Sequence, residues 1–219
     1  MSIESSIAID GPAAAGKSAV GERVARELGY RFFDTGAMYR AVTWYALQHG
    51  VDVNDAAELA RTVKGLRIDV RFGEGETAVF VNGHDATPHL REPAVERNVS
   101  IVSRVPAVRE SLVRIQRALA AEGNVVMAGR DIGTVVLPQA RLKVYLDASA
   151  AVRAKRRAEQ ERGAAADIEE LRRSIERRDD IDSRREASPL TAAGDAVIIN
   201  TDELSLEEVV RRIVKLARD

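Results

Sequence analysis

The sequence predicts an α/β protein built on a five-stranded parallel sheet that is flanked by helices. Three observations carry this prediction. A short β-branched run at residues 7–9 leads through a glycine-rich loop into a helical segment, four more segments of strand length follow along the chain, and helical stretches separate most of them. Strands that alternate with helices are typical of a parallel sheet with right-handed crossovers. A small antiparallel β insert at residues 66–95 and a charged helical region at residues 151–187 interrupt this alternation.

Length and composition limit the class of protein. A chain of 219 residues is long enough for one substantial core and a small inserted subdomain, and its 45% hydrophobic and 31% charged residues are typical of a soluble globular protein. It contains no apolar stretch of the roughly 20 residues that a membrane helix needs, and its N-terminal Met-Ser-Ile-Glu does not resemble a signal peptide. We therefore expect a cytoplasmic protein with no membrane partner. The net charge of −1 argues against a nucleic-acid partner, and zero cysteines with three histidines argue against structural zinc.

The first loop has the spacing of a phosphate-binding loop, Gly-x-x-x-x-Gly-Lys-Ser. Glycines let the backbone curl around phosphate oxygens, the N–H groups at the start of the following helix face the anion, the lysine reaches the outer phosphates and the serine hydroxyl helps to hold Mg²⁺. The alternative is a glycine-bounded turn with no ligand. The candidate nucleotide-binding residues are Gly11, Pro12, Ala13, Ala14, Ala15, Gly16, Lys17 and Ser18, and Ser18 is the candidate metal ligand.

A second strand and helix repeat the arrangement. After a helix at Ala19–Leu28, an aromatic strand at Tyr30–Phe33 leads through residues 34–36 into a helix at Ala37–His49, which Gly50 ends. Ligands of parallel sheets bind at the carboxyl ends of the strands, so the polar groups of residues 34–40 are candidate ligand contacts. They are Thr35, Tyr39 and Arg40. A cation in the first turn of a helix opposes the helix dipole, which favours an anionic partner for Arg40 over a solvated side chain.

The next region contains a helix and then closely spaced strands. Residues 52–64 predict a helix that begins at Asp52 or Asn54 and ends before Gly65. It is followed by a segment of alternating apolar and polar residues at 66–72 and a short strand at 77–81. The hairpin signal Asn-Gly at 82–83 and an extended piece at 84–87 come next. Their tight spacing predicts the antiparallel insert, in which we interpret the histidines as surface residues.

The second half returns to the parallel pattern. Helices are predicted at 91–103 and 106–121, and a buried strand at 124–128 runs directly into Arg130 and Asp131. These two side chains lie at the expected ligand-binding edge, although an ion pair that closes a turn is the alternative. Further strands are predicted at 141–147 and 196–200, and the capping box Ser-x-x-Glu at 205–208 starts the last helix.

The charged region at residues 149–187 predicts two antiparallel helices joined by residues 163–167. Arg153 and Arg157 are four residues apart, and Arg178, Asp182 and Arg185 have helical spacing, so each set is expected to share one helix face. Abundant acidic neighbours favour solvated helices with ion pairs for most of the arginines. An arginine-rich helix pair also suits a cover over a triphosphate, because arginines brought in by closure neutralise the transferred group.

Four segments together resemble the bacterial type of cytidylate kinase, within the nucleoside monophosphate kinase family. They are Ile9–Pro12 with the phosphate loop, Asp34–Arg40, Ala128–Thr134 and Arg178–Asp182, and the resemblance covers nearly the whole chain. It implies one kinase domain, with a P-loop kinase core at 1–65, 96–150 and 188–219, an acceptor-side insert at 66–95 and a helical lid at 151–187. The chain has no Asn-Lys-x-Asp sequence for guanine recognition, which argues against a GTPase switch.

The resemblance also implies roles for individual residues. Lys17 and Ser18 match the contacts to ATP and Mg²⁺. The residues that match the acceptor site are Arg40, Arg130 and Arg185 on the phosphate, Arg178 and Asp182 on the ribose, and Ser100, Arg109 and Asp131 on the base; Arg153 and Arg157 match the lid. Chemistry supports the base assignment, because cytosine presents an amine donor beside acceptor atoms and needs both an acceptor and a donor.

The expected reaction is transfer of the γ-phosphoryl group of ATP to CMP, and also to dCMP. The expected catalytic residues are Lys17, Arg40, Arg130, Arg153, Arg157 and Arg185. The alternatives are a kinase for UMP or another small acceptor, and a nucleotide-binding regulator without turnover. Ala14 stands where the family usually has glycine, and Ala19 replaces a frequent threonine, which we interpret as tuning of nucleotide affinity. We expect a monomer.

Overall fold

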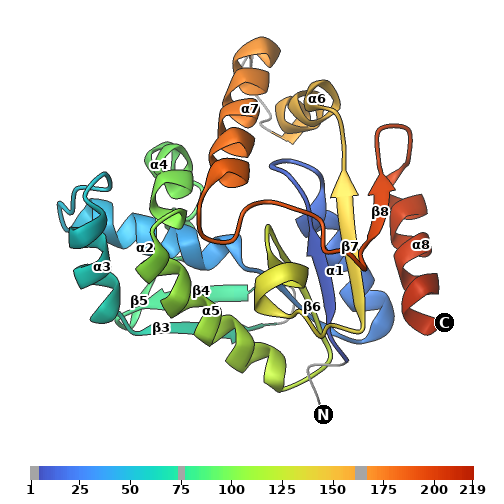
Figure 1. Cartoon of the computed structure of the whole chain (residues 1–219), viewed down its shortest axis with the longest axis horizontal. Coiled ribbons are helices and arrows are strands. Elements are labelled where there is room, and N and C mark those ends of the chain that lie inside the picture. The colour runs from blue at the N-terminus through green and yellow to red at the C-terminus, as the bar shows by residue number, and fades with distance from the viewer. Residues whose placement is uncertain (1–4, 74–76, 161–166) are drawn as a thin grey trace. The chain divides into compact units, whose positions relative to one another are not determined.

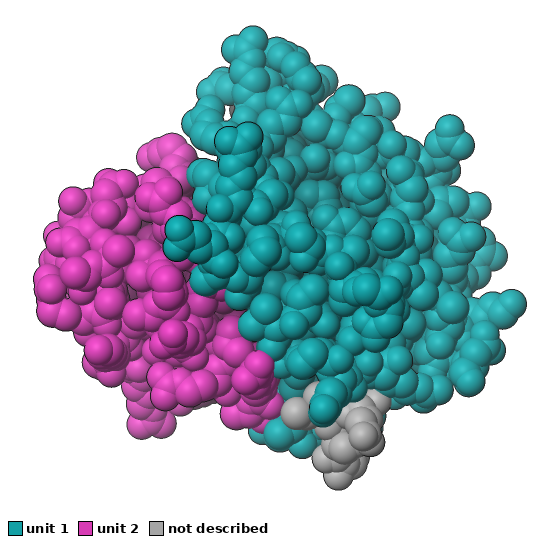
Figure 2. Space-filling model, viewed as in Figure 1, with its two compact units in different colours: residues 1–33, 120–219 teal, residues 34–119 magenta. Residues whose placement is uncertain are grey.

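The structure is a computed structural model, and it describes residues 5–73, 77–160 and 167–219. The chain divides into two compact units. The first contains residues 1–33 and 120–219, and the second contains residues 34–119 (Figure 2). Each unit is described by itself below.

The first unit is built on the five-stranded parallel sheet that the sequence predicts. Its strands are β1 (Ile7–Asp10), β2 (Arg31–Asp34), β6 (Val125–Gly129), β7 (Leu142–Asp147) and β8 (Val197–Asn200). They lie in the order β2-β6-β1-β7-β8, so the first strand pairs in parallel with β6 on one side and β7 on the other. Every residue of β1 and β6 is buried, as expected for central strands with covered faces.

Two amphipathic helices pack together against the sheet of the first unit (Figure 1). They are α1 (Lys17–Leu28) and α8 (Leu206–Arg218). Val20 and Val24 of α1 and Ile213 of α8 share one buried cluster with the strands. The predicted capping box starts α8, because the Ser205 hydroxyl accepts the N–H of Glu208 while the Glu208 carboxylate accepts the N–H of Ser205.

The predicted pair of charged helices is present. The two helices are α6 (Ala150–Gln160) and α7 (Ile168–Arg184), and they lie beyond the carboxyl ends of β1 and β7 (Figure 1). Asp167 caps α7 by accepting the N–H groups of Glu169 and Glu170. The rest of the predicted connection, residues 163–166, lies outside the described residues.

The expectation that Arg185 shares a helix face with Arg178 and Asp182 is wrong. Helix α7 ends at Arg184, and Arg185 has extended backbone angles. The chain turns back here because the N–H of Leu190 donates to the carbonyl of Asp182, and the Arg185 side chain donates to the carbonyl of Ser188. The turn nevertheless keeps the Arg185 guanidinium beside the Asp182 carboxylate, at 3.7 Å.

The second unit combines helices with a three-stranded antiparallel sheet. Its elements are α2 (Gly36–Gln48), α3 (Ala56–Lys64), β3 (Ile68–Phe72), β4 (Thr77–Val81), β5 (His84–Asp85), the 3₁₀ turn η2 (Thr87–His89), α4 (Pro93–Ser103) and most of α5 (Pro106–Ala121). The strand order is β3-β4-β5, with β4 antiparallel to both neighbours. The predicted hairpin turn is confirmed, since Asn82 and Gly83 have φ angles of 50° and 83°.

The predicted start of α3 is wrong. The N-cap is Asp55, whose Oδ1 accepts the N–H groups of Ala57 and Glu58 at 2.8 and 3.0 Å. Asp52 instead accepts the N–H of Asn54 in a turn before the helix. Three residues within four positions can cap a helix, and the choice among them depends on the backbone of the preceding turn, which the residue types alone do not specify.

Candidate active site

The loop after β1 is shaped by two glycines. Gly11 has a φ of 149°, and a Cβ atom there would clash with the carbonyl oxygen of Leu146. Gly16 has a φ of 87° and is the N-cap of α1. Between them, Ala14 has a φ of 59°, which an L-residue with a side chain rarely adopts. The glycines therefore allow the sharp loop that the motif predicts, and Ala14 tolerates a strained backbone.

Lys17 turns back over this loop. Its ammonium group donates to the carbonyl of Pro12 at 2.6 Å, and its side chain is largely buried. Helix α1 begins at Lys17 with a glycine N-cap, which has no side chain to cap the first N–H groups. A buried cation and the positive end of a helix therefore face the same loop, which suits a bound phosphate group.

These residues fit a nucleotide with bound Mg²⁺. Ser18 follows Lys17 in the first turn of α1, where its hydroxyl can act as a metal ligand. Among the described residues, no group of three or more His, Cys, Asp or Glu side chains is arranged to hold a metal ion. Mg²⁺ commonly takes most of its ligands from phosphate oxygens and water, so one serine in such a loop is an adequate protein ligand.

Asp10, the last residue of β1, is a buried carboxylate that joins two loops. Its Oδ1 and Oδ2 accept the backbone N–H groups of Ile132 and Gly133 at 2.8 and 2.7 Å. Burial raises its pKa from 3.8 to about 6, although the two hydrogen bonds oppose this shift. Asp10 thus ties the start of the phosphate loop to the segment after β6. The sequence interpretation missed this role, and the only signal was a carboxylate next to an apolar strand.

The segment after β6 brings four predicted residues together. Arg130 donates from Nε to Oδ2 of Asp182 at 2.9 Å, and the guanidinium of Arg185 lies 3.8 Å from Asp131. Asp131 precedes η3, a single π-helical turn at Ile132–Val136. Two arginines and two aspartates form this group, which we call the β6 cluster: Arg130, Asp131, Asp182 and Arg185. The half-buried Arg178 lies one turn before Asp182 on α7.

The helix pair also reaches the phosphate loop. Arg153 is buried, and its guanidinium donates to the carbonyls of Ala148 and Ala13, both at 2.9 Å. It also pairs with Asp179 of α7 at 2.5 Å. Arg157 lies one turn further along α6 and is half-buried.

The second unit carries the other predicted acceptor residues. Arg40 of α2 donates from Nε to Glu96 of α4 at 2.9 Å. Arg109 of α5 is buried with its guanidinium 5.3 Å from the centre of the Tyr39 ring, and it donates to the carbonyl of Ser103. Two further predicted residues are buried, Thr35 as the N-cap of α2 and Ser100 on α4. Glu96 was not predicted, because its pairing joins residues that are 56 positions apart in the chain.

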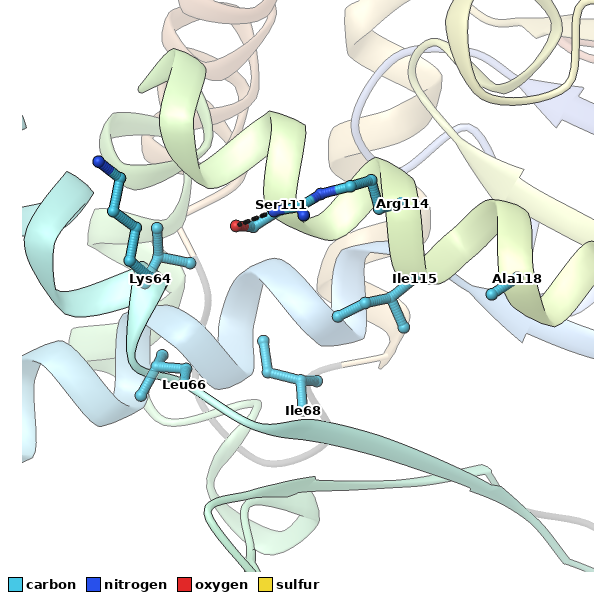
Figure 3. Close-up of a pocket in the computed structure, with 8 residues that line it drawn as sticks. Lys64, Leu66, Ile68, Ser111, Arg114, Ile115 and Ala118 are labelled. Carbon is cyan, nitrogen blue, oxygen red and sulfur yellow. Dashed lines mark hydrogen bonds between the residues drawn. The ribbon is translucent and has the colours of Figure 1, made fainter.

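A cavity of about 400 Å³ in the second unit is separate from these groups. It lies between the end of α3, the start of β3 and α5 (Figure 3). Most of the side chains that line it are aliphatic, and the polar ones are Lys64, Ser111 and Arg114. All eight described residues that line it differ from the predicted site residues. The candidate site is therefore defined by the loop and arginine geometry and not by this cavity.

The fold and the phosphate loop define the class of protein. A parallel sheet with a glycine-rich loop between β1 and α1, a buried loop lysine and an arginine-bearing helix pair is the architecture of a P-loop kinase. A crystal structure of shikimate kinase from Bacteroides thetaiotaomicron is similar in fold, with a TM-score of 0.50 and 18% identity over 98% of each chain.

In the described residues, no helix combines the length and apolar character needed to cross a membrane.

Sequence comparison then gives the family. The sequence model of cytidylate kinase matches residues 7–219. The chain is 50% identical to the cytidylate kinase of Geobacillus sp. (strain WCH70), over 97% of this chain and 96% of the relative. It is also 50% identical to that of Geobacillus kaustophilus (strain HTA426), over 98% and 96% of the two chains. The chain belongs to the cytidylate kinase family.

Proposed function

We propose that the chain transfers the γ-phosphoryl group of ATP to CMP and dCMP, which gives ADP and the nucleoside diphosphate. The observation that carries this proposal is a pair of anion-binding features in the first unit. The phosphate loop follows β1, the β6 cluster follows β6, and these two strands are parallel neighbours with the register Asp10 to Gly129. Their carboxyl ends therefore meet at one edge of the sheet. A protein that only binds ATP needs one such feature, whereas a kinase for a phosphorylated acceptor needs two.

The chemistry requires positioning more than proton transfer. The acceptor phosphate is already an anionic nucleophile, so the reaction needs no strong general base. Catalysis then consists of in-line alignment and neutralisation of charge by Lys17 and the arginines. Ser18 would hold Mg²⁺, which would supply further neutralisation of the triphosphate. A lid at α6 and α7 excludes water that would otherwise accept the phosphoryl group.

The β6 cluster is suited to hold the acceptor phosphate. Arg130 and Arg185 are held by the carboxylates of Asp182 and Asp131, so their guanidinium groups have little rotational freedom to lose when an anion binds. Arg178 and Asp182 are proposed to contact the ribose. In the second unit, Arg40 is proposed as a third phosphate contact, and Thr35 and Tyr39 are proposed to line the acceptor site.

The base is proposed to be read by Ser100, Arg109 and Asp131. A carboxylate and a hydroxyl accept from the exocyclic amine of cytosine, and a guanidinium donates to its acceptor atoms. Uracil presents an oxygen where cytosine has the amine, so it would leave the carboxylate facing another acceptor. This difference predicts a preference for CMP over UMP.

An acceptor panel tests the function. ADP formation is measured with Mg-ATP and, separately, CMP, dCMP, UMP, AMP, GMP or no acceptor. A preference for CMP and dCMP supports both the reaction and the base contacts. Turnover with UMP alone or AMP alone would keep the kinase and reject the base contacts. A folded protein that binds ATP and uses none of them would reject the nucleotide acceptor, and would favour a different small acceptor or a regulator without turnover.

We further propose, from the sequence, that the chain uses Mg²⁺, is cytoplasmic and monomeric, and has no nucleic-acid partner.

A further inference from the structure

Two side chains of the helix pair α6 and α7 bind the backbone N–H and carbonyl groups of Ala13 in the phosphate loop. Its N–H donates to Oδ1 of Asp179 at 3.0 Å, and its carbonyl accepts from Nη1 of Arg153 at 2.9 Å. Asp179 and Arg153 also pair with each other at 2.5 Å. Arg153 is fixed further by the carbonyl of Ala148. One residue of the loop therefore has both of its backbone polar groups bound by one ion pair.

Apolar contacts strengthen this attachment. Ala13 forms a buried cluster with Ala154 of α6 and Ile175 of α7, and Ala14 and Leu171 pack against it. The methyl group of Ala13 thus contacts the same helix pair that binds its peptide groups. The attachment involves the backbone and the side chain together, so it restricts the loop in more than one direction.

The attachment lies next to the strained residue of the loop. Ala14 has a φ of 59°, a left-handed conformation that crowds its Cβ against the carbonyl oxygen. A strained residue persists only when the surrounding structure fixes it. The groups that fix the preceding residue are Arg153 and Asp179, so this ion pair supports the strained backbone at Ala14.

This ion pair differs from the others on the same helices. The side chains of Arg153 and Asp179 are 7% and 17% exposed, whereas those of Arg184 and Asp180, another pair on α7, are 81% and 53% exposed. An exposed pair contributes little, but removal of one partner from a buried pair leaves an uncompensated charge. Asp180 therefore provides a matched control for Asp179.

We propose that Arg153 and Asp179 form a clamp on Ala13 that holds the phosphate loop in its nucleotide-binding conformation. Both are positioning residues, which act on ATP through the loop backbone. Arg153 then has a different task from an arginine that touches the transferred phosphoryl group. The proposal rests on the proposed function only in taking an adenine nucleotide as the ligand of the loop.

The first test measures nucleotide binding by the whole chain without turnover. The variants are Asp179→Asn, Arg153→Lys and the control Asp180→Asn, and the probe is ADP with Mg²⁺ in equilibrium titrations. Loss of the clamp is expected to raise the Kd for ADP about tenfold, because the loop must then be ordered by the ligand. The KM for ATP should rise in parallel, the KM for CMP should stay unchanged, and the control should behave as the wild type.

A double variant separates a clamp from a direct contact. Two residues that act as a unit are not additive, so Arg153→Lys with Asp179→Asn should weaken ADP binding no more than either change alone. If Arg153 touches the transferred phosphoryl group instead, Arg153→Lys would lower kcat far more than Asp179→Asn and leave the Kd for ADP unchanged. That result would overturn the clamp.

Ala14→Gly provides a rescue. Glycine adopts a φ near +60° with no steric penalty, so the loop needs less support. Added to Asp179→Asn, Ala14→Gly should recover part of the lost ADP affinity, because the relaxed loop backbone depends less on the clamp. A double variant no better than Asp179→Asn argues against the clamp.

A measurement on the unchanged protein covers the case in which Asp179→Asn does not fold. The Ala13 amide should be protected from hydrogen exchange without nucleotide, because its N–H is bonded to Asp179. Exchange at the rate of a free amide would overturn the proposal. Since ADP binding and amide exchange need no acceptor, a failed acceptor panel would reject the proposed reaction and leave the clamp to be judged separately.

Discussion

At the scale of single residues, most buried charges of this protein lie where the phosphate groups are proposed to bind. Six of these charged side chains belong to residues that are each less than a tenth exposed: Asp10, Lys17, Asp131, Arg153, Asp182 and Arg185. Each of them contacts a backbone group or an opposite charge, so the cost of burial is offset by defined partners. Such a concentration of paired charges makes stability and activity sensitive to the same side chains.

Asp10 gives a prediction for stability against pH. Its folded pKa of about 6 lies above the ordinary 3.8, so the folded protein binds the proton more tightly and its free energy of unfolding falls as the pH rises through this window. Asp10→Asn removes this titration. The free energy of unfolding is measured in urea for both proteins. The difference, variant minus wild type, should therefore increase by about 2 kcal/mol from roughly pH 4.5 to pH 7. Curves that stay parallel would show an ordinary pKa for Asp10.

Arg130 gives a prediction for catalysis. Arg130→Ala removes a proposed acceptor-phosphate contact, and kcat/KM for CMP should fall by about a thousandfold, because this arginine both binds the acceptor phosphate and neutralises its charge next to the incoming phosphoryl group. Circular dichroism should show an intact fold, since Asp182 keeps Arg185 as a neighbour. Arg141→Ala, an exposed arginine before β7, is the control. A folded and fully active Arg130→Ala protein would remove that side chain from the acceptor site.

The sequence predicted which residues form the phosphate loop, but it did not predict several of the contacts that the site residues make. Gly11, Gly16 and Lys17 have fixed spacing along the chain, so their shared loop follows from the sequence. The contacts of Arg153 with Ala13, and of Arg40 with Glu96, join residues 140 and 56 positions apart. Such contacts depend on how the elements pack, which no local pattern encodes.

At the scale of elements, periodicity predicted the helices and strands well and their ends less well. The strand at 77–81 and the helix at 106–121 have the predicted bounds, because the Asn-Gly turn at 82–83 marks the end of the first and Pro106 marks the start of the second. Helix α3 begins later than expected, and α7 ends before Arg185. Both errors concern ends that are set by side-chain bonds to the backbone, which compete locally with continued helix.

The start of α3 gives a test of this correction. Asp55→Ala removes the acceptor for two helix N–H groups and should destabilise the protein by about 1 kcal/mol. Asn54→Ala, the matched control, removes a side chain of the preceding turn and should cost much less. Urea unfolding of both variants measures the difference. A larger loss of stability in Asn54→Ala than in Asp55→Ala would mean that Asn54 caps α3, as the sequence predicted.

At the scale of the whole molecule, the order of the strands determines which groups can act together. The order β2-β6-β1-β7-β8 places two distant segments of the chain side by side, so the phosphate loop and the β6 cluster occupy adjacent strand ends. The sequence predicted a five-stranded parallel sheet from its alternation of elements. It did not predict which strands are neighbours, because many orders satisfy the same alternation.

This adjacency predicts that one molecule can occupy both features at once. An adenosine and a cytidine linked through a polyphosphate chain should bind roughly 100-fold more tightly than ATP alone, because binding at the phosphate loop raises the effective concentration of the second half at the β6 cluster. In steady-state kinetics it should compete with both ATP and CMP. Arg130→Ala should abolish the competition with CMP and keep the competition with ATP. Competition with ATP alone in the wild type would mean that the two features serve separate ligands that cannot meet, and phosphoryl transfer between them would then have no geometric basis.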